Sequence, residues 1–237
     1  MADYGLQVVN DGGFVQIDST YKNLGLLAKG SVISSGTPTQ TGWYPAVFSV
    51  AVGATPIVAA RPSSGYAVLV STVLSGNTVT YTYYCDASGT TLYYWVFDDP
   101  ARGINDGSNY GLLVRNAASE VVFDSRLRYM RVLGFFSGNE YYAPAPPIDS
   151  GETFSYASSN LAVVQSAFRH WWTGIALGSP PNSGYALLFM TGFSISGSNA
   201  TFKLCNVNTI YSNQGPITVE GNRIENYAYM VLDVSNF

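Results

Sequence analysis

The chain has 237 residues, of which 47% are hydrophobic and 11% charged, with a formal net charge of −4 at pH 7. This length allows one large or two ordinary domains, and the hydrophobic fraction is large enough to build packed cores. The few basic residues argue against nucleic acid as a partner, because phosphate binding needs clustered lysine and arginine.

The first patterned segment is residues 4–19. Leu6 and Val8 precede an Asn- and Gly-containing turn at 10–13, and Val15 and Ile17 follow it. Apolar alternation on both sides of such a turn predicts a β-hairpin.

Short segments rich in β-branched and aromatic residues continue the chain, each bounded by Gly, Pro, Ser or Asn. We expect strands at 46–52, 66–73, 79–85 and 92–97. No stretch combines a helical period with caps. Regularly spaced short strands are typical of an all-β sandwich or barrel, and a sandwich-like fold is expected here.

An internal repeat organises the sequence. Three collinear pairs of segments match: 4–10 (YGLQVVN) with 110–116 (YGLLVRN), 64–69 (SGYAVL) with 183–188 (SGYALL), and 94–98 (YWVFD) with 229–233 (YMVLD). We therefore predict two tandem, related β-sandwich-like domains. The first domain comprises residues 1–98 and the second comprises residues 110–237, with residues 99–109 as the linker. The greater length of the second domain reflects insertions in its loops.

Residues that carry catalysis or bind metals are sparse. The single histidine, His170, lies near no serine or cysteine nucleophile motif. Candidate acids for glycoside hydrolysis are Asp98, Asp99, Asp149 and Glu152, but Asp98 and Asp99 stand at a strand exit, where Asp commonly starts a turn. We expect no catalytic residue, no cofactor and no metal site.

A repeated Asp-Ser pair, at 18–19 and 124–125, is the strongest remaining metal candidate. Both pairs follow an apolar alternation and so mark a strand end, where their side chains can bond to the turn backbone. The two cysteines, Cys85 and Cys205, lack zinc-like spacing and are expected to be reduced core thiols.

Aromatic clusters leave recognition as the main functional possibility. His170, Trp171 and Trp172 have no aromatic counterpart in the first copy, so they form the candidate recognition surface. Since alternate residues of a strand face opposite sides, at most one of the two tryptophans is expected to pack inward. The competing interpretation is a histidine at a strand end beside core tryptophans.

The opening segment, with YGLQVVN at 4–10 and a strand ending in Asp18-Ser19, resembles the start of tail-tip or minor tail proteins of tailed bacteriophages. The second copy, from Tyr110 to Ser125, resembles it equally. The resemblance implies a non-enzymatic virion protein at the distal tail that assembles with other tail proteins. A compact tip component is favoured over a long fibre, because no shaft sequence is present.

This interpretation predicts a homo-oligomer, either a trimer or a hexamer, that also contacts a host receptor or glycan. Its low surface charge favours association. We expect no membrane span and no signal peptide, hence a soluble protein made in the host cytoplasm and placed in the virion tail. A carbohydrate-binding module is the first alternative, and a glycan-cleaving enzyme is the second.

Overall fold

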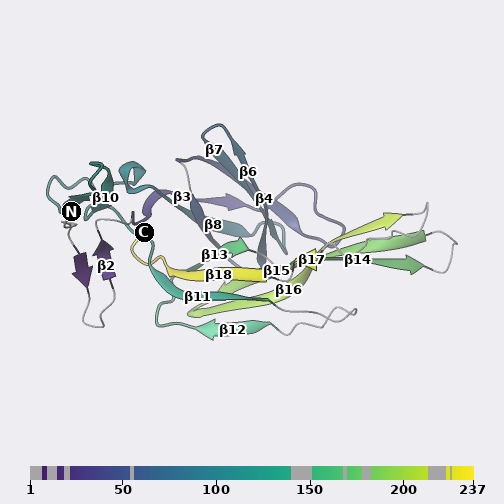
Figure 1. The fold of residues 1–237 in the computed structure, drawn as a ribbon. Coiled ribbons are helices and arrows are strands. Elements are labelled where there is room, and N and C mark those ends of the chain that lie inside the picture. Colours follow the sequence, from purple (N-terminus) through teal and green to yellow (C-terminus); the bar gives the residue numbers. More distant parts are fainter. Residues whose placement is uncertain are drawn as a thin grey trace.

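The computed structural model describes residues 7–9, 15–18, 22–53, 56–139, 151–167, 170–177, 183–212, 223–224 and 226–237. Two stacked sheets form the body of an elongated molecule (Figure 1). The expected all-β, sandwich-like fold class is confirmed.

The strands divide between the two halves of the chain. The first half contains β1 (Gln7–Val9), β2 (Val15–Asp18), β3 (Gly25–Ile33), β4 (Tyr44–Ala51), β5 (Ile57–Pro62), β6 (Ala67–Ser75), β7 (Thr78–Cys85) and β8 (Thr91–Asp98). A 3-10 helix, η1 (Pro100–Arg102), follows. The second half contains β9 (Leu113–Arg115), β10 (Val121–Asp124), β11 (Val132–Asn139), β12 (Glu152–Ser155), β13 (Leu161–Ala167), β14 (His170–Leu177), β15 (Ser183–Ser196), β16 (Asn199–Ser212), β17 (Arg223–Ile224) and β18 (Asn226–Asp233).

Both halves contribute to both sheets. The six-stranded sheet has the order β11-β18-β13-β5-β8-β3, and the other sheet has the order β12-β16-β15-β6-β7-β4, with β14 added to β15 and β17 to β14. The halves meet edge to edge, where Val163 of β13 faces Ala60 of β5 and Phe193 of β15 faces Ala67 of β6. The strands of both predicted domains therefore complete the same two sheets.

The order of strands is the same in each half when read outward from these junctions. The three matching segments fall on β1 and β9, on β6 and β15, and on β8 and β18. The ladder of β3 with β8 shifts register after Leu26, and the ladder of β11 with β18 shifts after Val132. Turn residues Gly76 and Gly197 both have positive φ, at 57° and 56°. These features support the predicted relation of the halves, which stays a prediction together with its boundaries at 98 and 110.

Alternation along the strands builds the core between the sheets. In β7 the side chains of Val79, Tyr81, Tyr83 and Cys85 are all buried, with their neighbours turned outward. From the opposite sheet, Tyr94 stacks on Phe48 with ring centroids 3.8 Å apart. Every second residue of a strand thus faces the interior, and the two sheets together supply the two sides of the core.

Both cysteines are buried and neither forms a disulfide, as expected. Cys85 belongs to the core between the sheets, while Cys205 lies in a smaller cluster with Trp43, Val68 and Met190. Burial raises the pKa of the Cys85 thiol to about 12, so this thiol stays protonated at neutral pH.

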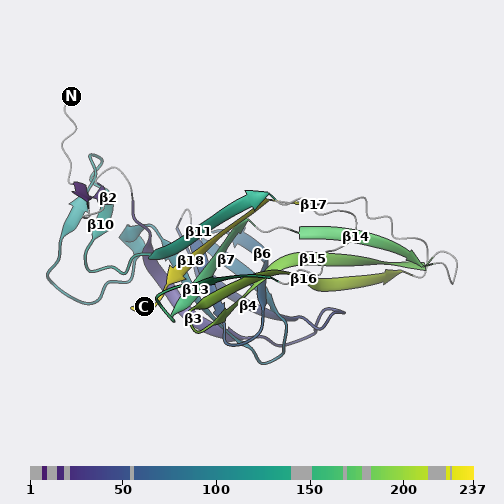
Figure 2. The same ribbon diagram turned by 90° about the horizontal axis from the view of Figure 1, so that it is seen from below.

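The two ends of the molecule differ. The hairpins β1–β2 and β9–β10 lie at one end, and β14, β15 and β16 extend from the sandwich at the other (Figure 2). We call this extension the arm; it comprises residues 170–177, 183–190 and 205–212. No helix in the described residues has the length and apolar character needed to span a bilayer.

Candidate recognition surface

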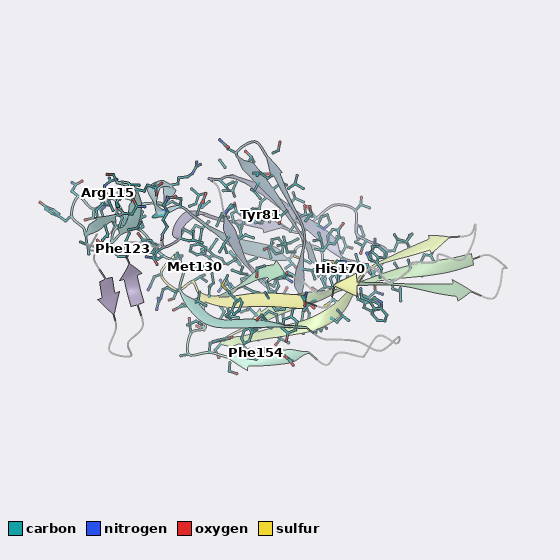
Figure 3. All side chains as sticks on the ribbon, viewed as in Figure 1. Tyr81, Arg115, Phe123, Met130, Phe154 and His170 are labelled. Atoms are coloured by element: carbon teal, nitrogen blue, oxygen red, sulfur yellow. The ribbon has the colours of Figure 1, made fainter. Side chains whose placement is uncertain are left out.

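The predicted recognition residues His170, Trp171 and Trp172 begin β14, at the base of the arm. Figure 3 shows His170 where the arm leaves the sandwich. On one side β14 pairs with β15, so that Trp171 faces Phe189 and Trp172 faces Leu188. On the other side β17 pairs with the first two residues of the cluster. The cluster thus lies inside a ladder, where backbone pairing fixes its orientation.

The two tryptophans face opposite sides and are buried to different degrees. Trp171 is only 9% exposed, and its ring stacks on Phe189 with centroids 5.8 Å apart. Trp172 is half-buried and shares a face with Leu188. His170 is also half-buried, and burial lowers its pKa below the ordinary value. One tryptophan is therefore anchored and the other remains partly accessible, while the role of the cluster in recognition stays a prediction.

The carboxylates considered for catalysis hold the backbone instead. Asp98 is fully buried and accepts hydrogen bonds from the N–H groups of Gly53 and Asp99. Asp99 accepts from the N–H of Ala101 at 2.9 Å and pairs with Lys22 at 2.8 Å. Glu152 is exposed at the start of β12, and Asp149 lies outside the described residues. Asp98 and Asp99 thus point to separate partners and cap a strand end.

The Asp-Ser pair of the second copy has the expected turn role. Asp124 accepts from the backbone N–H of Arg126 at 3.0 Å and from its Nε at 2.8 Å, and the side-chain hydrogen bond lowers the pKa of Asp124. Ser125 Oγ accepts from the N–H of Leu112 at 2.8 Å. Among the described residues, no group of His, Cys, Asp and Glu is placed to hold a metal ion. The side chain of Asp18 and all of Ser19 lie outside the described residues.

A second aromatic surface lies on the outer face of the six-stranded sheet. Arg61 of β5 places its Cζ 5.3 Å from the ring centroid of Tyr93 and 5.8 Å from that of Trp95. Lys29 of β3 faces Trp95 directly across the ladder. Tyr94 lies between Tyr93 and Trp95 on β8 and packs into the core. Tyr93 and Trp95 therefore point to the outer face of the sheet. We call these four residues, Lys29, Arg61, Tyr93 and Trp95, the Arg61 face.

The two cations of the Arg61 face are not neutralised by the described part of the chain. The ion pairs there use Lys22, Arg126 and Arg131, and neither Lys29 nor Arg61 has a carboxylate partner. The guanidinium group lies over both rings, of which Tyr93 is 37% exposed and Trp95 is 8% exposed. A planar cation held against aromatic rings can still direct its N–H groups at an external acceptor.

Sequence reasoning did not find this face. The alternation of Tyr93 with Trp95 in a predicted strand shows that both share one side, and this signal was present. The position of Arg61 beside them follows from the neighbouring placement of β5 and β8, with Arg61 opposite Tyr93. No local sequence pattern predicts that β5 pairs with β8.

Comparisons with protein-family models, curated proteins and solved structures give no match for this chain.

Proposed function

We propose that the chain is a non-enzymatic structural protein of a bacteriophage tail tip, which assembles with copies of itself and other tail proteins and takes part in host attachment. The resemblance of its two YGL openings to tail proteins motivates the assignment. The parts that carry it, β1–β2 and β9–β10, form paired strands at one end of the molecule.

The observation that carries the assembly role is the set of large apolar side chains left on the surface of strands. Phe135 and Ile33 are each 60% exposed, Leu74 is 62% exposed and Tyr211 is 64% exposed. Only 11% of the residues are charged, so electrostatic repulsion between molecules does little to prevent contact between such apolar surfaces. Association with partner surfaces accounts for this composition.

Antibody labelling of phage particles tests the proposal. Particles made from the genome that encodes the chain are purified, labelled with antibody against the chain and viewed by electron microscopy. Label at the distal end of the tail, together with the chain in the particle's mass spectrum, is the expected result. Particles that lack the chain would overturn the proposal.

Carbohydrate binding is a second candidate, and the Arg61 face favours it. The exposed ring of Tyr93 can stack on a sugar face, and an unneutralised guanidinium group can pair with the carboxylate of an acidic sugar. We expect oligosaccharides that contain uronic acid to quench tryptophan fluorescence of the isolated chain. Arg61→Ala should abolish the response, whereas Arg115→Ala, at a distant exposed position, should not. Equal responses from the two variants would remove this candidate.

A further inference from the structure

β3 and β11 are the outermost strands of the six-stranded sheet, one at each edge. Lys29 of β3 faces Trp95, and Phe135 of β11 faces Met230. Trp95 and Met230 hold the same place in the third pair of matching segments, and both ladders shift register shortly before these positions. Lys29 and Phe135 are therefore equivalent positions on equivalent edges.

The two edges differ in what they present to solvent. β3 has an exposed lysine in its middle, whereas β11, with the sequence VLGFFSGN, contains no charged residue. Phe135 is 60% exposed, and Val132 and Leu133 beside it are 47% and 40% exposed. A free edge is a template for another strand, and proteins commonly guard it with lysine or proline. Of the two edges, β3 is guarded and β11 is not.

Among the residues that the structure describes, the outer backbone edge of β11 is open to a partner strand. Within the described residues, β11 forms a ladder only with β18. Every second residue of an edge strand directs its N–H and C=O groups away from the sheet. An apolar, uncharged edge strand leaves hydrophobic side chains in water, which is unfavourable. Its unpaired backbone groups also make it prone to pair with another strand.

A second copy of the chain is the occupant that the structure favours. The chain already joins its own halves by antiparallel edge pairing, of β5 with β13 and of β6 with β15. Two β11 strands related by a twofold axis also run antiparallel, so each copy supplies the partner that the other needs. The net charge of −4 opposes association in general, but an uncharged strand brings no charge to the contact.

We propose that β11 is a self-association edge, at which two copies pair antiparallel through β11 and continue the six-stranded sheet from one molecule into the next. Phe135 packs against the same strand of the second copy on the outer face of this sheet. The contact deepens the assembly part of the proposed function. A twofold contact builds dimers, and hexamers when it is combined with a threefold one, but it does not build a trimer by itself.

Sedimentation velocity over a concentration series tests the contact with a matched pair of variants. Phe135→Lys gives β11 the residue that β3 carries at the equivalent position, and Ile33→Lys changes an equally exposed residue on the opposite edge strand. Wild type and Ile33→Lys should associate alike. Phe135→Lys should weaken association at least about tenfold, since like charges would face each other across the axis. Thermal unfolding confirms that both variants fold.

Hydrogen exchange distinguishes strand pairing from any other contact. The amides of residues 134–137 should be protected at high protein concentration and exchange faster on dilution, and Phe135→Lys should abolish the concentration dependence. A monomeric wild type, variants that associate equally, or β11 amides that exchange alike at all concentrations would each overturn the proposal. Concentration-independent exchange would indicate that β11 pairs with a strand of another protein instead. All three outcomes are independent of the antibody labelling that tests the proposed function.

Discussion

Gln165 joins the two sheets by accepting a hydrogen bond at 2.8 Å from the backbone N–H of Leu69. Its amide nitrogen donates to the carbonyl oxygen of Thr191 at 2.9 Å. Leu69 belongs to the first half and Thr191 to the second, so one buried side chain on β13 bonds to both halves of the facing sheet beside their junction.

Gln165→Leu should destabilise the fold strongly. The variant keeps the apolar bulk but leaves the N–H of Leu69 without its buried partner, at a cost of about 2–3 kcal/mol in the free energy of unfolding. Urea denaturation measures the loss. Ser49→Ala is the control, because its hydrogen bond to Thr80 is exposed. Similar stabilities for the two variants would show that the bridge contributes little.

Two tyrosine-to-phenylalanine substitutions should have opposite effects. The Tyr83 hydroxyl is buried without a hydrogen-bond partner among the described residues, whereas the Tyr129 hydroxyl accepts from the N–H of Asp124. Tyr83→Phe should leave stability unchanged or raise it by up to about 1 kcal/mol, and Tyr129→Phe should lower it by about 1 kcal/mol. Thermal unfolding compares them. A clear loss in Tyr83→Phe would reveal a partner for that hydroxyl, such as a buried water.

His170 should make stability depend on pH near neutrality. Because burial lowers its pKa, the unfolded chain, with an ordinary pKa of ~6.5, binds a proton at a pH where the folded chain does not. The free energy of unfolding should therefore be constant above this range and fall as the pH is lowered through it. Denaturation series at several pH values measure the slope. His170→Gln removes the only histidine, and an unchanged slope in this variant would contradict the assignment.

Alanine substitutions at Trp171 and Trp172 should separate packing from recognition. Trp171→Ala should destabilise the fold by about 3–5 kcal/mol, because it removes a buried ring that stacks on Phe189. Trp172→Ala should cost less stability and weaken partner binding by ~2 kcal/mol or more, the scale of an interface hot spot. Urea denaturation and titration with the partner measure the two effects. Unchanged partner binding by Trp172→Ala would contradict a role of His170, Trp171 and Trp172 in recognition.

Much of the strand content follows from local pattern. The predicted segments 46–52, 66–73, 79–85 and 92–97 coincide with β4, β6, β7 and β8 to within two residues at each end. This agreement has a simple cause, since alternating burial repeats every two residues and Gly, Pro and Ser mark the turns. The absence of a disulfide between Cys85 and Cys205 and the turn role of Asp124 also followed from local sequence.

The joining of the two halves could not be predicted in this way. Whether β5 pairs with β13 depends on which backbone edges remain free after each half has formed its own ladders, and backbone edges have no composition of their own. The same limit hid the strand β17 beside His170 and the position of Arg61 against Tyr93. The opposite orientation of Trp171 and Trp172 was local and could be foreseen.

Edge-to-edge joining has a consequence for synthesis of the chain on the ribosome. When the first half has been synthesised, β5 can pair with β8, and β6 can pair with β7. The other edges of β5 and β6 stay unpaired until β13 and β15 have been synthesised. During this interval a nascent first half can pair with the first half of a neighbouring nascent chain, because the two halves have the same strand order. Prompt translation of the second half, or a chaperone that covers Ala60 and Ala67 until it arrives, thus protects the yield of correctly joined molecules.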